Sequence, residues 1–307
     1  MEVSGKKLIE EASSFDAVGS HELTNKRLGV QAEGYVDVTN FKFTPSSSIP
    51  VKDPSDAIDC WLTSMLLLPM NRLLLTDYHN ETVKLVDLET SRLVSQVRVP
   101  GGPCDMCLLP GDRVAVSLTS GKIQFLETRG EIALGANIRV DSDCRGIGYH
   151  NDRLILSYYS GKVEMMDMKT TKKIDTVIEE SMFCDPEYLA VIMEDQTAVI
   201  YVSDFKKNTI SKLDMDLNLI QTFQNPALRA PTSILLLDNQ LIICGFGSDN
   251  IMRLDLPSGQ LTQVLGKNEG INWPRSVCYS QQYTKLYVTC TRYDDNGDFV
   301  KVYKESA

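Results

Sequence analysis

One pair of cysteines, Cys104-Asp-Met-Cys107, has the spacing of a zinc half-site or of a redox pair. No second such pair accompanies it, and the only histidines are His21, His79 and His150. The pair falls within a predicted strand, where residues three apart point to opposite faces. We therefore predict reduced cysteines without a metal, and no cofactor.

Three acidic residues, Asp105, Asp143 and Glu187, stand near the starts of predicted strands in successive repeats. Calcium-dependent lactonases bind their ion with Glu, Asn and Asp from several repeats, and the ion polarises a substrate oxygen. No Asn stands at the matching positions here, and Arg275 occupies one of them. We interpret the three acids as solvated loop residues and predict no enzyme, with a lactonase or esterase as the second alternative.

The chain contains six repeats of a short apolar segment, and an aromatic residue follows this segment in five of them. Arginines and a tryptophan stand in the segments between repeats. Aromatic and arginine side chains dominate protein-binding hot spots. The predicted partner-binding residues are Tyr78, Tyr159, Phe205, Phe246, Trp273, Tyr293, Arg145 and Arg275. The alternative is that each ring packs over its own turn.

Six basic residues are expected to form an arc on the same face of the fold as these aromatic residues. Together with the aromatic rings, such an arc would suit single-stranded RNA. The six residues are Lys206, Lys207, Arg229, Lys267, Arg275 and Arg292. Acidic residues share this surface, and 31 Lys and Arg against 41 Asp and Glu give a formal charge of −10. Such a charge repels phosphate backbones, so RNA is the first alternative to a protein or peptide partner.

The elements that position these residues are repeats of a short apolar segment whose starts lie roughly 40 to 46 residues apart. The copies are Arg72–Asp77, Arg113–Leu118, Arg153–Tyr158, Val199–Asp204, Gln240–Gly245 and Lys285–Cys290. This period is typical of four-stranded blades arranged around an axis. The sequence therefore predicts an all-β, six-bladed β-propeller. Each copy is its blade's second strand, apolar at consecutive positions because neighbouring blades cover both faces.

The sixth repeat supplies only three strands, which would leave an exposed sheet edge. Residues 38–44 are rich in strand formers and precede the first blade, so we predict that they close the ring by pairing with residues 299–303. The predicted domains are an N-terminal extension, 1–57, which holds this strand and a short helix or disorder, and the propeller, 58–307.

The start of the chain has acidic residues and no apolar run of signal length, and no later stretch reaches the roughly 18 apolar residues of a membrane helix. The eight cysteines mostly occupy apolar strand positions, as expected of reduced thiols. We predict a cytoplasmic protein with no membrane partner.

Three repeats carry a further signature, in the segments Asp77–Asp87, Ser203–Asp214 and Gly245–Asp255. These segments resemble the Asp-x-x-Asn-x-x-Ile/Val-x-x-Phe/Leu-Asp core of NHL repeats. Arg145-Gly-Ile-Gly148 and Pro274-Arg-Ser-Val277 look like the Pro-x-Gly-Ile start of the same repeat. A physical reason fits, because Asp77 and Asp204 can accept hydrogen bonds from the turn that follows, and Asn tolerates positive φ.

The whole chain looks most like the C-terminal NHL propeller of tripartite-motif proteins. In that family a RING, B-boxes and a coiled coil supply ubiquitin ligation and dimerisation, and the propeller binds substrate protein or RNA. No paired Cys/His array precedes residue 58 in this chain, so ligase activity is not carried over. The resemblance implies a non-catalytic protein-interaction module, such as a substrate-recognition or adaptor propeller.

Overall fold

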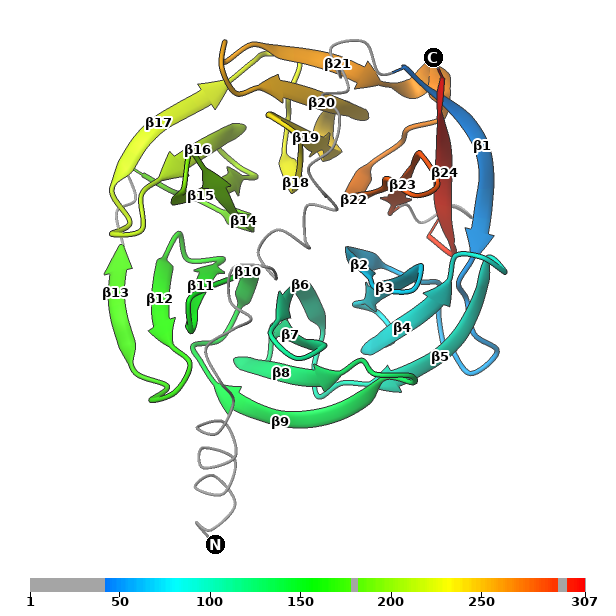
Figure 1. Ribbon diagram of the computed structural model, residues 1–307, viewed down its shortest axis with the longest axis horizontal. Coiled ribbons are helices and arrows are strands. Elements are labelled where there is room, and N and C mark those ends of the chain that lie inside the picture. Colours follow the sequence, from blue (N-terminus) through cyan, green and yellow to red (C-terminus); the bar gives the residue numbers. More distant parts are fainter. Residues whose placement is uncertain (1–41, 178–181, 292–296, 307) are drawn as a thin grey trace, which may run out of the picture.

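The computed structural model describes residues 42–177, 182–291 and 297–306 (Figure 1). Six four-stranded antiparallel sheets surround a central axis, which confirms the predicted six-bladed β-propeller. The predicted helix or disorder near the N-terminus lies outside the described residues. No helix in the described ranges is long and apolar enough to cross a membrane.

Each blade runs from an inner strand at the axis to an outer strand at the rim. The inner strands are β2 (Leu62–Leu68), β6 (Pro103–Leu109), β10 (Cys144–His150), β14 (Pro186–Glu194), β18 (Pro231–Leu237) and β22 (Pro274–Ser280). The second strands are β3 (Arg72–Asp77), β7 (Arg113–Leu118), β11 (Arg153–Tyr158), β15 (Thr197–Asp204), β19 (Gln240–Gly245) and β23 (Lys285–Cys290). These second strands are buried almost throughout, as their continuous apolar pattern predicts.

The third and outer strands complete the blades. The third strands are β4 (Thr82–Asp87), β8 (Lys122–Glu127), β12 (Val163–Asp167), β16 (Thr209–Leu213), β20 (Asn250–Asp255) and β24 (Phe299–Ser306). The outer strands are β5 (Arg92–Arg98), β9 (Ala133–Arg139), β13 (Lys173–Val177), β17 (Leu219–Gln224), β21 (Leu261–Leu265) and β1 (Lys42–Pro50). Two short 3₁₀ helices, η3 (Phe246–Ser248) and η4 (Lys267–Glu269), lie in connections of blades five and six.

The N-terminal strand β1 closes the ring by pairing antiparallel with β24 of blade six, as predicted. The register differs from the prediction, because residues 299–303 pair with residues 45–50 and residues 42–44 pair with residues 304–306. The strand includes Pro45 and Pro50, which are residues typical of loops. An outer strand tolerates proline, because one of its edges has no ladder to donate to.

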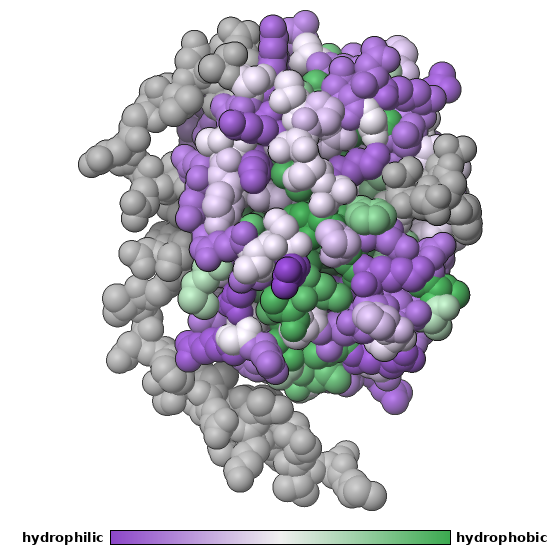
Figure 2. Space-filling view, turned by 90° about the vertical axis from the view of Figure 1, so that its right-hand side faces the viewer, coloured by the Kyte–Doolittle hydropathy of each residue, from purple (hydrophilic) through white to green (hydrophobic). Residues whose placement is uncertain are grey.

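The hydrophobic core consists of clusters that lie between neighbouring blades rather than within one blade. Between blades six and one, for example, Ile49 of β1 packs with Leu73 and Tyr287. Seen from the side that carries β1 and β24, most of the surface is hydrophilic, with hydrophobic side chains gathered below its centre (Figure 2). Neighbouring blades are therefore held together by hydrophobic packing, and the loops near the central axis are attached to this ring of packed blades.

Candidate functional site at the mouth of the central channel

One backbone hydrogen bond recurs at the same end of every blade. The residue after the second strand donates its N–H to the carbonyl of the residue just before the inner strand, with donor–acceptor distances of 2.9–3.2 Å. The pairs are Tyr78 to Trp61, Thr119 to Gly102, Tyr159 to Asp143, Phe205 to Asp185, Phe246 to Ala230 and Thr291 to Trp273. This bond brings the two kinds of loop together on one face, as the sequence argument requires.

The donor position holds an aromatic residue in blades one, three, four and five. In blade six the equivalent residue is Thr291, and the predicted Tyr293 lies outside the described residues, as does Arg292. Tyr293 comes two residues after Thr291 in the chain. The hydrogen bond shows that blade six has no aromatic residue at this position.

The rings on this face contact residues of neighbouring blades. Phe205, Phe246 and Trp273 come from three consecutive blades, with ring centroids 5.6 Å and 5.3 Å apart, and we call these three the aromatic row. Tyr78 lies against the backbone of Gly102 in blade two, where any added Cβ would come within 2.5 Å of the ring. The alternative that each ring packs only over its own turn does not describe these contacts.

Trp273 is held in a strained backbone conformation, with a φ of 49°. A bulky residue in this left-handed region is unusual and costs on the order of 1–3 kcal/mol. The Asp249 carboxylate accepts a hydrogen bond from the Trp273 N–H at 2.8 Å and holds the turn in place. The indole, 37% exposed, is therefore positioned before any partner arrives.

The second residue of each inner strand occupies an equivalent place around the axis, because the ladder to the second strand is irregular there in every blade. We call these six residues the channel layer, and they are Thr63, Cys104, Arg145, Glu187, Thr232 and Arg275. Arg275 is 9% exposed, and its Nη2 forms an ion pair with Glu187 Oε1. The channel layer therefore carries two arginines and one carboxylate.

Two acids that we interpreted as solvated loop residues are in fact buried. Glu187 is paired with Arg275, and the Asp105 carboxylate accepts hydrogen bonds from Ser64 Oγ at 2.8 Å and from the Ile147 N–H at 3.1 Å. Asp105 thus joins blades one, two and three below the channel layer. The sequence prediction failed because these partners lie about 40 or more residues away.

Tyr188 closes the channel beneath this layer. It follows Glu187 on β14 and is 4% exposed, and its hydroxyl donates to the carbonyl of Thr63 in blade one. Blades one and four face each other across the ring, so the side chain spans the channel (Figure 1). Burial raises the pKa of Tyr188 well above its ordinary value, so the hydroxyl remains a donor.

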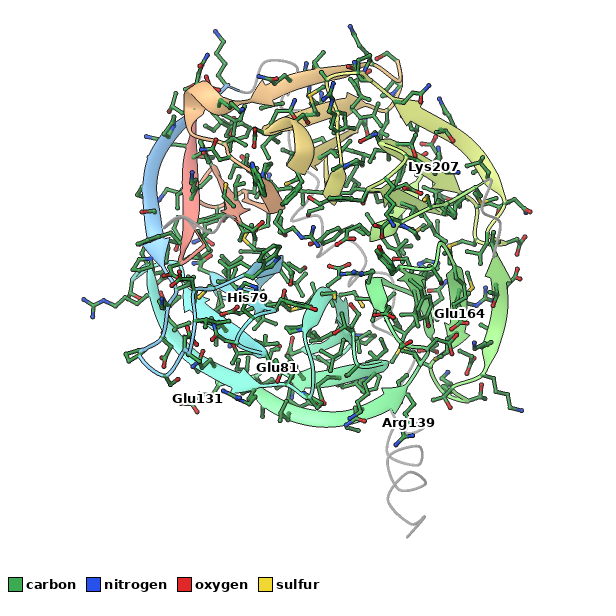
Figure 3. The ribbon with its side chains drawn as sticks, turned by 180° about the vertical axis from the view of Figure 1, so that it is seen from behind. His79, Glu81, Glu131, Arg139, Glu164 and Lys207 are labelled. Atoms are coloured by element: carbon green, nitrogen blue, oxygen red, sulfur yellow. The ribbon has the colours of Figure 1, made fainter. Side chains whose placement is uncertain are left out.

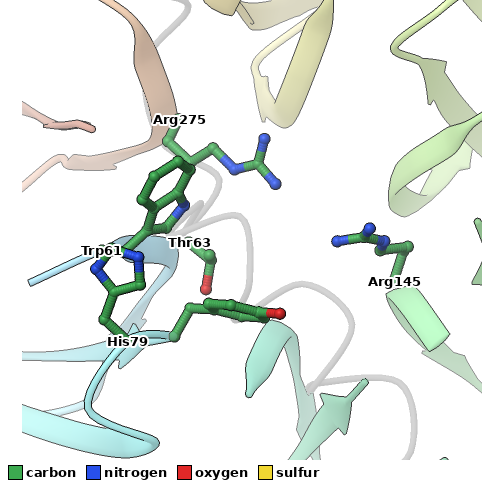
Figure 4. Close-up of a pocket in the computed structure, with 6 residues that line it drawn as sticks. Trp61, Thr63, His79, Arg145 and Arg275 are labelled. Atoms are coloured by element: carbon green, nitrogen blue, oxygen red, sulfur yellow. The ribbon is translucent and has the colours of Figure 1, made fainter. Parts of the chain in front are cut away.

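A pocket of about 320 Å³ lies above this floor and is lined by Trp61, Thr63, Tyr78, His79, Arg145 and Arg275. Arg145 and Arg275 extend into it from opposite sides, and the Trp61 and His79 rings form one wall (Figure 4). We call this the channel-mouth pocket. It unites three predicted site residues, Tyr78, Arg145 and Arg275.

Sequence reasoning missed Trp61, Thr63 and His79. Trp61 occupies the same position as Trp273 before an inner strand, so aligning the repeats at this position would have found it. The Trp61 and His79 rings lie 4.9 Å apart, and His79 Nδ1 lies 3.2 Å from the Asp59 carbonyl oxygen. His79 and Lys207 follow the second strands of blades one and four and lie on opposite sides of the ring (Figure 3).

Three of the six members of the predicted basic arc have acidic partners. Lys206 Nζ lies 3.5 Å from Asp185, Lys267 Nζ lies 2.9 Å from Asp249, and Arg275 is paired with Glu187. Burial, followed by the neighbouring Glu187, raises the pKa of Asp185. Positive and negative side chains are therefore paired with one another on the face that carries the basic arc.

Tyr159, 47% exposed, lies between two cations of this face. Lys206 Nζ is 4.1 Å from its ring centroid, and the Arg145 guanidinium carbon is 5.3 Å away. Cation–π contacts of this kind hold charged side chains over a ring. Tyr159 thus joins the loops of blades three and four at the edge of the channel-mouth pocket.

Cys104 and Cys107 are separated as predicted. Cys104 belongs to the channel layer, whereas Cys107 packs in the hydrophobic cluster between blades two and three. Neither cysteine forms a disulfide, both are buried, and burial raises the pKa of Cys104 to about 12. Cys104 is therefore not poised as a nucleophile, because the reactive form is the thiolate.

The acidic residues of the NHL-like signature act largely as predicted. The Asp204 carboxylate accepts from the N–H groups of Lys206 and Lys207 at 3.1 Å and 2.9 Å, and also from Cys184 before the inner strand. Asn208 adopts a φ of 59°. In blades one and five the positive φ falls instead on Glu81 and Asp249, next to the asparagine.

A second cluster of charges lies inside blade one. Lys84 Nζ donates to Asp56 Oδ2, contacts Asp77 Oδ2 at 3.1 Å and the Val51 carbonyl oxygen at 3.1 Å, and lies 3.3 Å from Cys60 Sγ. Among the described residues, Asp56, Cys60 and Asp77 are the one group with the spacing of metal ligands. The Lys84 ammonium already provides the cation between them, so we call this the lysine cluster and assign it a structural role.

No family model matches the chain, and no curated protein matches it in sequence. Solved structures do resemble it. A catalytically inactive variant of virginiamycin B lyase from Staphylococcus aureus, with quinupristin, superposes with a TM-score of 0.61 at 11% identity, over 86% of this chain and 99% of the other. A streptogramin B lyase gives 0.60 at 12% identity, over 87% and 88%. A protein of unknown function from Bacteroides thetaiotaomicron gives 0.64 at 13% identity, over 87% and 77%. At these identities the likeness shows the fold alone.

Proposed function

We propose that this chain is a non-catalytic protein-recognition module that binds a protein or peptide on the face carrying the aromatic row and the channel-mouth pocket. The observation that carries the proposal is the aromatic row itself. Three rings from three blades touch one another at the surface, and Trp273 is held there at a conformational cost. Preorganised aromatic residues beside arginines are typical of binding hot spots.

The resemblance to NHL repeats extends the proposal to a substrate-recognition or adaptor propeller related to the tripartite-motif proteins. It is supported by the turn contacts of Asp204 and by those of Asp77, which accepts from the Trp61 N–H at 3.0 Å and from Asn80 Nδ2 at 2.8 Å. We propose the cytoplasm as the place of action, because none of the eight cysteines forms a disulfide and seven of them are buried.

RNA is the first alternative, and the ion pairs of the basic arc count against it. Lys206, Lys267 and Arg275 each have a carboxylate partner, so a phosphate would have to compete with Asp185, Asp249 and Glu187. A lactonase-like function has less support. The channel layer holds one carboxylate, Glu187, already paired with Arg275, whereas calcium takes six to eight oxygen ligands.

The test replaces Phe205, Phe246 and Trp273 together by Ala. The matched control replaces three exposed rim residues, Leu134, Ile174 and Leu219, by Ala. Partners captured from the organism's own cells by the unmodified protein should be lost with the first variant and kept with the second. For a purified partner, each ring should be worth about 2 kcal/mol, or roughly thirtyfold in Kd.

Urea unfolding of both triple variants shows whether the fold survives. If the aromatic-row variant stays folded and still binds every partner as tightly as the control, the proposed face is wrong. RNA as the ligand would appear as binding that weakens steeply with added salt and depends on Lys206 and Lys207.

A further inference from the structure

The channel-mouth pocket contains two guanidinium groups whose hydrogen-bonding capacity is incompletely used. The Nε atoms of Arg145 and Arg275 are both buried, and neither has a hydrogen-bond partner among the described residues. A buried N–H without a partner costs about 1–3 kcal/mol. Both side chains line an open pocket, where a ligand group can supply the missing acceptor.

Arg275 is fixed in position before any ligand binds. Its Nη2 is paired with Glu187, and its guanidinium carbon lies 5.6 Å from the Tyr188 ring centroid and 5.8 Å from the Phe246 ring centroid. One edge of the guanidinium is thus used for Glu187, whereas Nε is not. Contact with Phe246 also couples this arginine to the aromatic row.

Arg145 reaches the pocket from the opposite side (Figure 4). The described part of the chain contains no ion pair to Arg145, although the channel layer offers Glu187 nearby. Its contact is with the Tyr159 ring, 5.3 Å from the guanidinium carbon. Burial would lower the pKa of Arg145, but the nearby Glu187 raises it, so two guanidinium groups share one carboxylate of the channel layer.

The walls and floor of the pocket define the shape of the ligand. Tyr188 closes the base, and Trp61, Tyr78 and His79 supply rings on one side. A volume of about 320 Å³ accommodates one side chain or a small organic acid and is at the low end for ligand pockets. Of the other charged groups close to the layer, Asp105 accepts hydrogen bonds from Ser64 and Ile147. Asp185 Oδ2 lies 3.5 Å from Lys206 Nζ, and Asp185 Oδ1 has no hydrogen-bond partner among the described residues.

We propose that the channel-mouth pocket binds a carboxylate of the partner, held between Arg145 and Arg275, with an adjacent apolar group against Trp61 and Tyr78. A planar guanidinium matches a planar carboxylate through two parallel hydrogen bonds. The inference rests on the proposed function, since it takes the carboxylate to belong to the protein or peptide that the aromatic row binds.

The experiment uses Trp61 as its reporter. The chain has two tryptophans, so in a Trp273→Phe background the emission of Trp61 alone reports on the pocket. The probes are N-acetylphenylalanine, which has a terminal carboxylate, its neutral amide, and N-acetylaspartylphenylalanine amide, whose only carboxylate is a side chain. Inorganic phosphate is the fourth probe.

A saturable change in Trp61 emission with a carboxylate probe, at least tenfold weaker with the neutral amide, is the expected result. Arg145→Gln should weaken that binding by a further tenfold or more. Arg229→Gln, an exposed arginine of the same face outside the pocket, should leave it unchanged. The carboxylate probe that binds more tightly identifies the source as a chain terminus or an acidic side chain.

Equal binding of acid and amide, tighter binding of phosphate, or no saturation with any probe would overturn the proposal. So would an Arg145→Gln variant that stays folded in urea and binds the acid as before. The small probes do not involve the aromatic row. A failure here with a successful aromatic-row experiment leaves the partner-binding face intact and removes only the carboxylate.

Discussion

The lysine cluster of blade one and the channel layer both contain buried side chains of opposite charge. They differ in how fully the positively charged groups are paired. Lys84 has three ammonium donors, and oxygens of Val51, Asp56 and Asp77 lie around them. In the channel layer, Glu187 forms an ion pair with only one of the two arginines. The Nε atoms of both arginines lack hydrogen-bond partners among the described residues. In the lysine cluster the cation is fully engaged, although Asp56 Oδ1 has no hydrogen-bond partner among the described residues, and the cluster holds the fold together. In the channel layer it is the cations that have unused donors, and this arrangement is suited to an anionic ligand.

The position of each cluster in the chain agrees with this difference. Val51 directly follows the closing strand β1, Asp56 lies in the connection to blade one, and Asp77 ends β3. Lys84 therefore ties the closing strand to the first blade. Arg275 links blade six to Glu187 of blade four, whereas Arg145 forms no ion pair with the described residues and its side chain ends in the pocket.

The largest expected effect separates these two regions directly. Lys84→Met should lower the free energy of unfolding by about 3–5 kcal/mol, because it leaves Asp56 and Asp77 as buried charges without their cation. Arg145→Gln should lower it by less than about 1 kcal/mol, since no ion pair is broken. Urea unfolding at neutral pH measures both. Equal losses would remove the distinction between the clusters.

A control for Lys84 exists on the third strand of blade four. Lys212 forms a partly exposed ion pair with Glu194, so Lys212→Met removes a lysine of similar placement but different burial. Its loss should not exceed about 1 kcal/mol. A larger loss would mean that the position of the lysine, rather than its burial, decides the effect.

Asp77 gives the lysine cluster a pH dependence with a defined sign. Burial alone would raise its pKa, but hydrogen bonds from Asn80 and the Trp61 amide and the charge of Lys84 hold it below its ordinary value of 3.8. Its contribution is therefore present above that value and is lost as the pH falls through the lower, folded pKa. Asp77→Asn should cost about 2 kcal/mol at pH 7 and progressively less below pH 3.8.

Urea midpoints of Asp77→Asn and the unmodified protein, compared from pH 7 downward, test this sign. Asp112→Asn is the control, because Asp112 forms an exposed pair with Arg129 and should show a small difference at every pH. A gap between Asp77→Asn and the unmodified protein that widened as the pH fell would contradict the assignment.

The smallest expected effect concerns the wall of the channel-mouth pocket. Gly102→Ala should cost roughly 1 kcal/mol, since the added Cβ would lie 2.5 Å from the Tyr78 ring and the ring must move. In a Tyr78→Ala background the same change should cost little, because the obstacle is gone. A double-mutant cycle by urea unfolding measures the difference. Equal costs in both backgrounds would show that Tyr78 does not rest on Gly102.

The fold could be predicted because its cause is repeated along the chain. Each second strand, such as Arg72–Asp77, is apolar at consecutive positions because neighbouring blades cover both of its faces. The register of β1 could not be predicted, because Pro45 and Pro50 are typical of loops and only pairing with β24 reveals the strand. Local sequence shows burial, whereas strand pairing is decided by segments far apart.

The candidate site was predicted in part for the same reason. Phe205, Phe246 and Arg145 were found because they recur at fixed points of the repeat. The pairing of Arg275 with Glu187 joins residues 88 positions apart, and Tyr188 reaches Thr63 over 125 positions. No pattern within one repeat encodes such contacts, so the sequence could name the side chains but not their partners.

The pairing of β1 with β24 also determines how the ring responds to force. Lys42 lies opposite Ser306, so the described chain enters and leaves blade six side by side. Tension that draws these two points apart would break the hydrogen bonds between β1 and β24 one after another, as in a zipper, instead of loading all of them in shear. The ring is therefore mechanically weakest at this seam, and blade six would open before the channel-mouth pocket is disturbed.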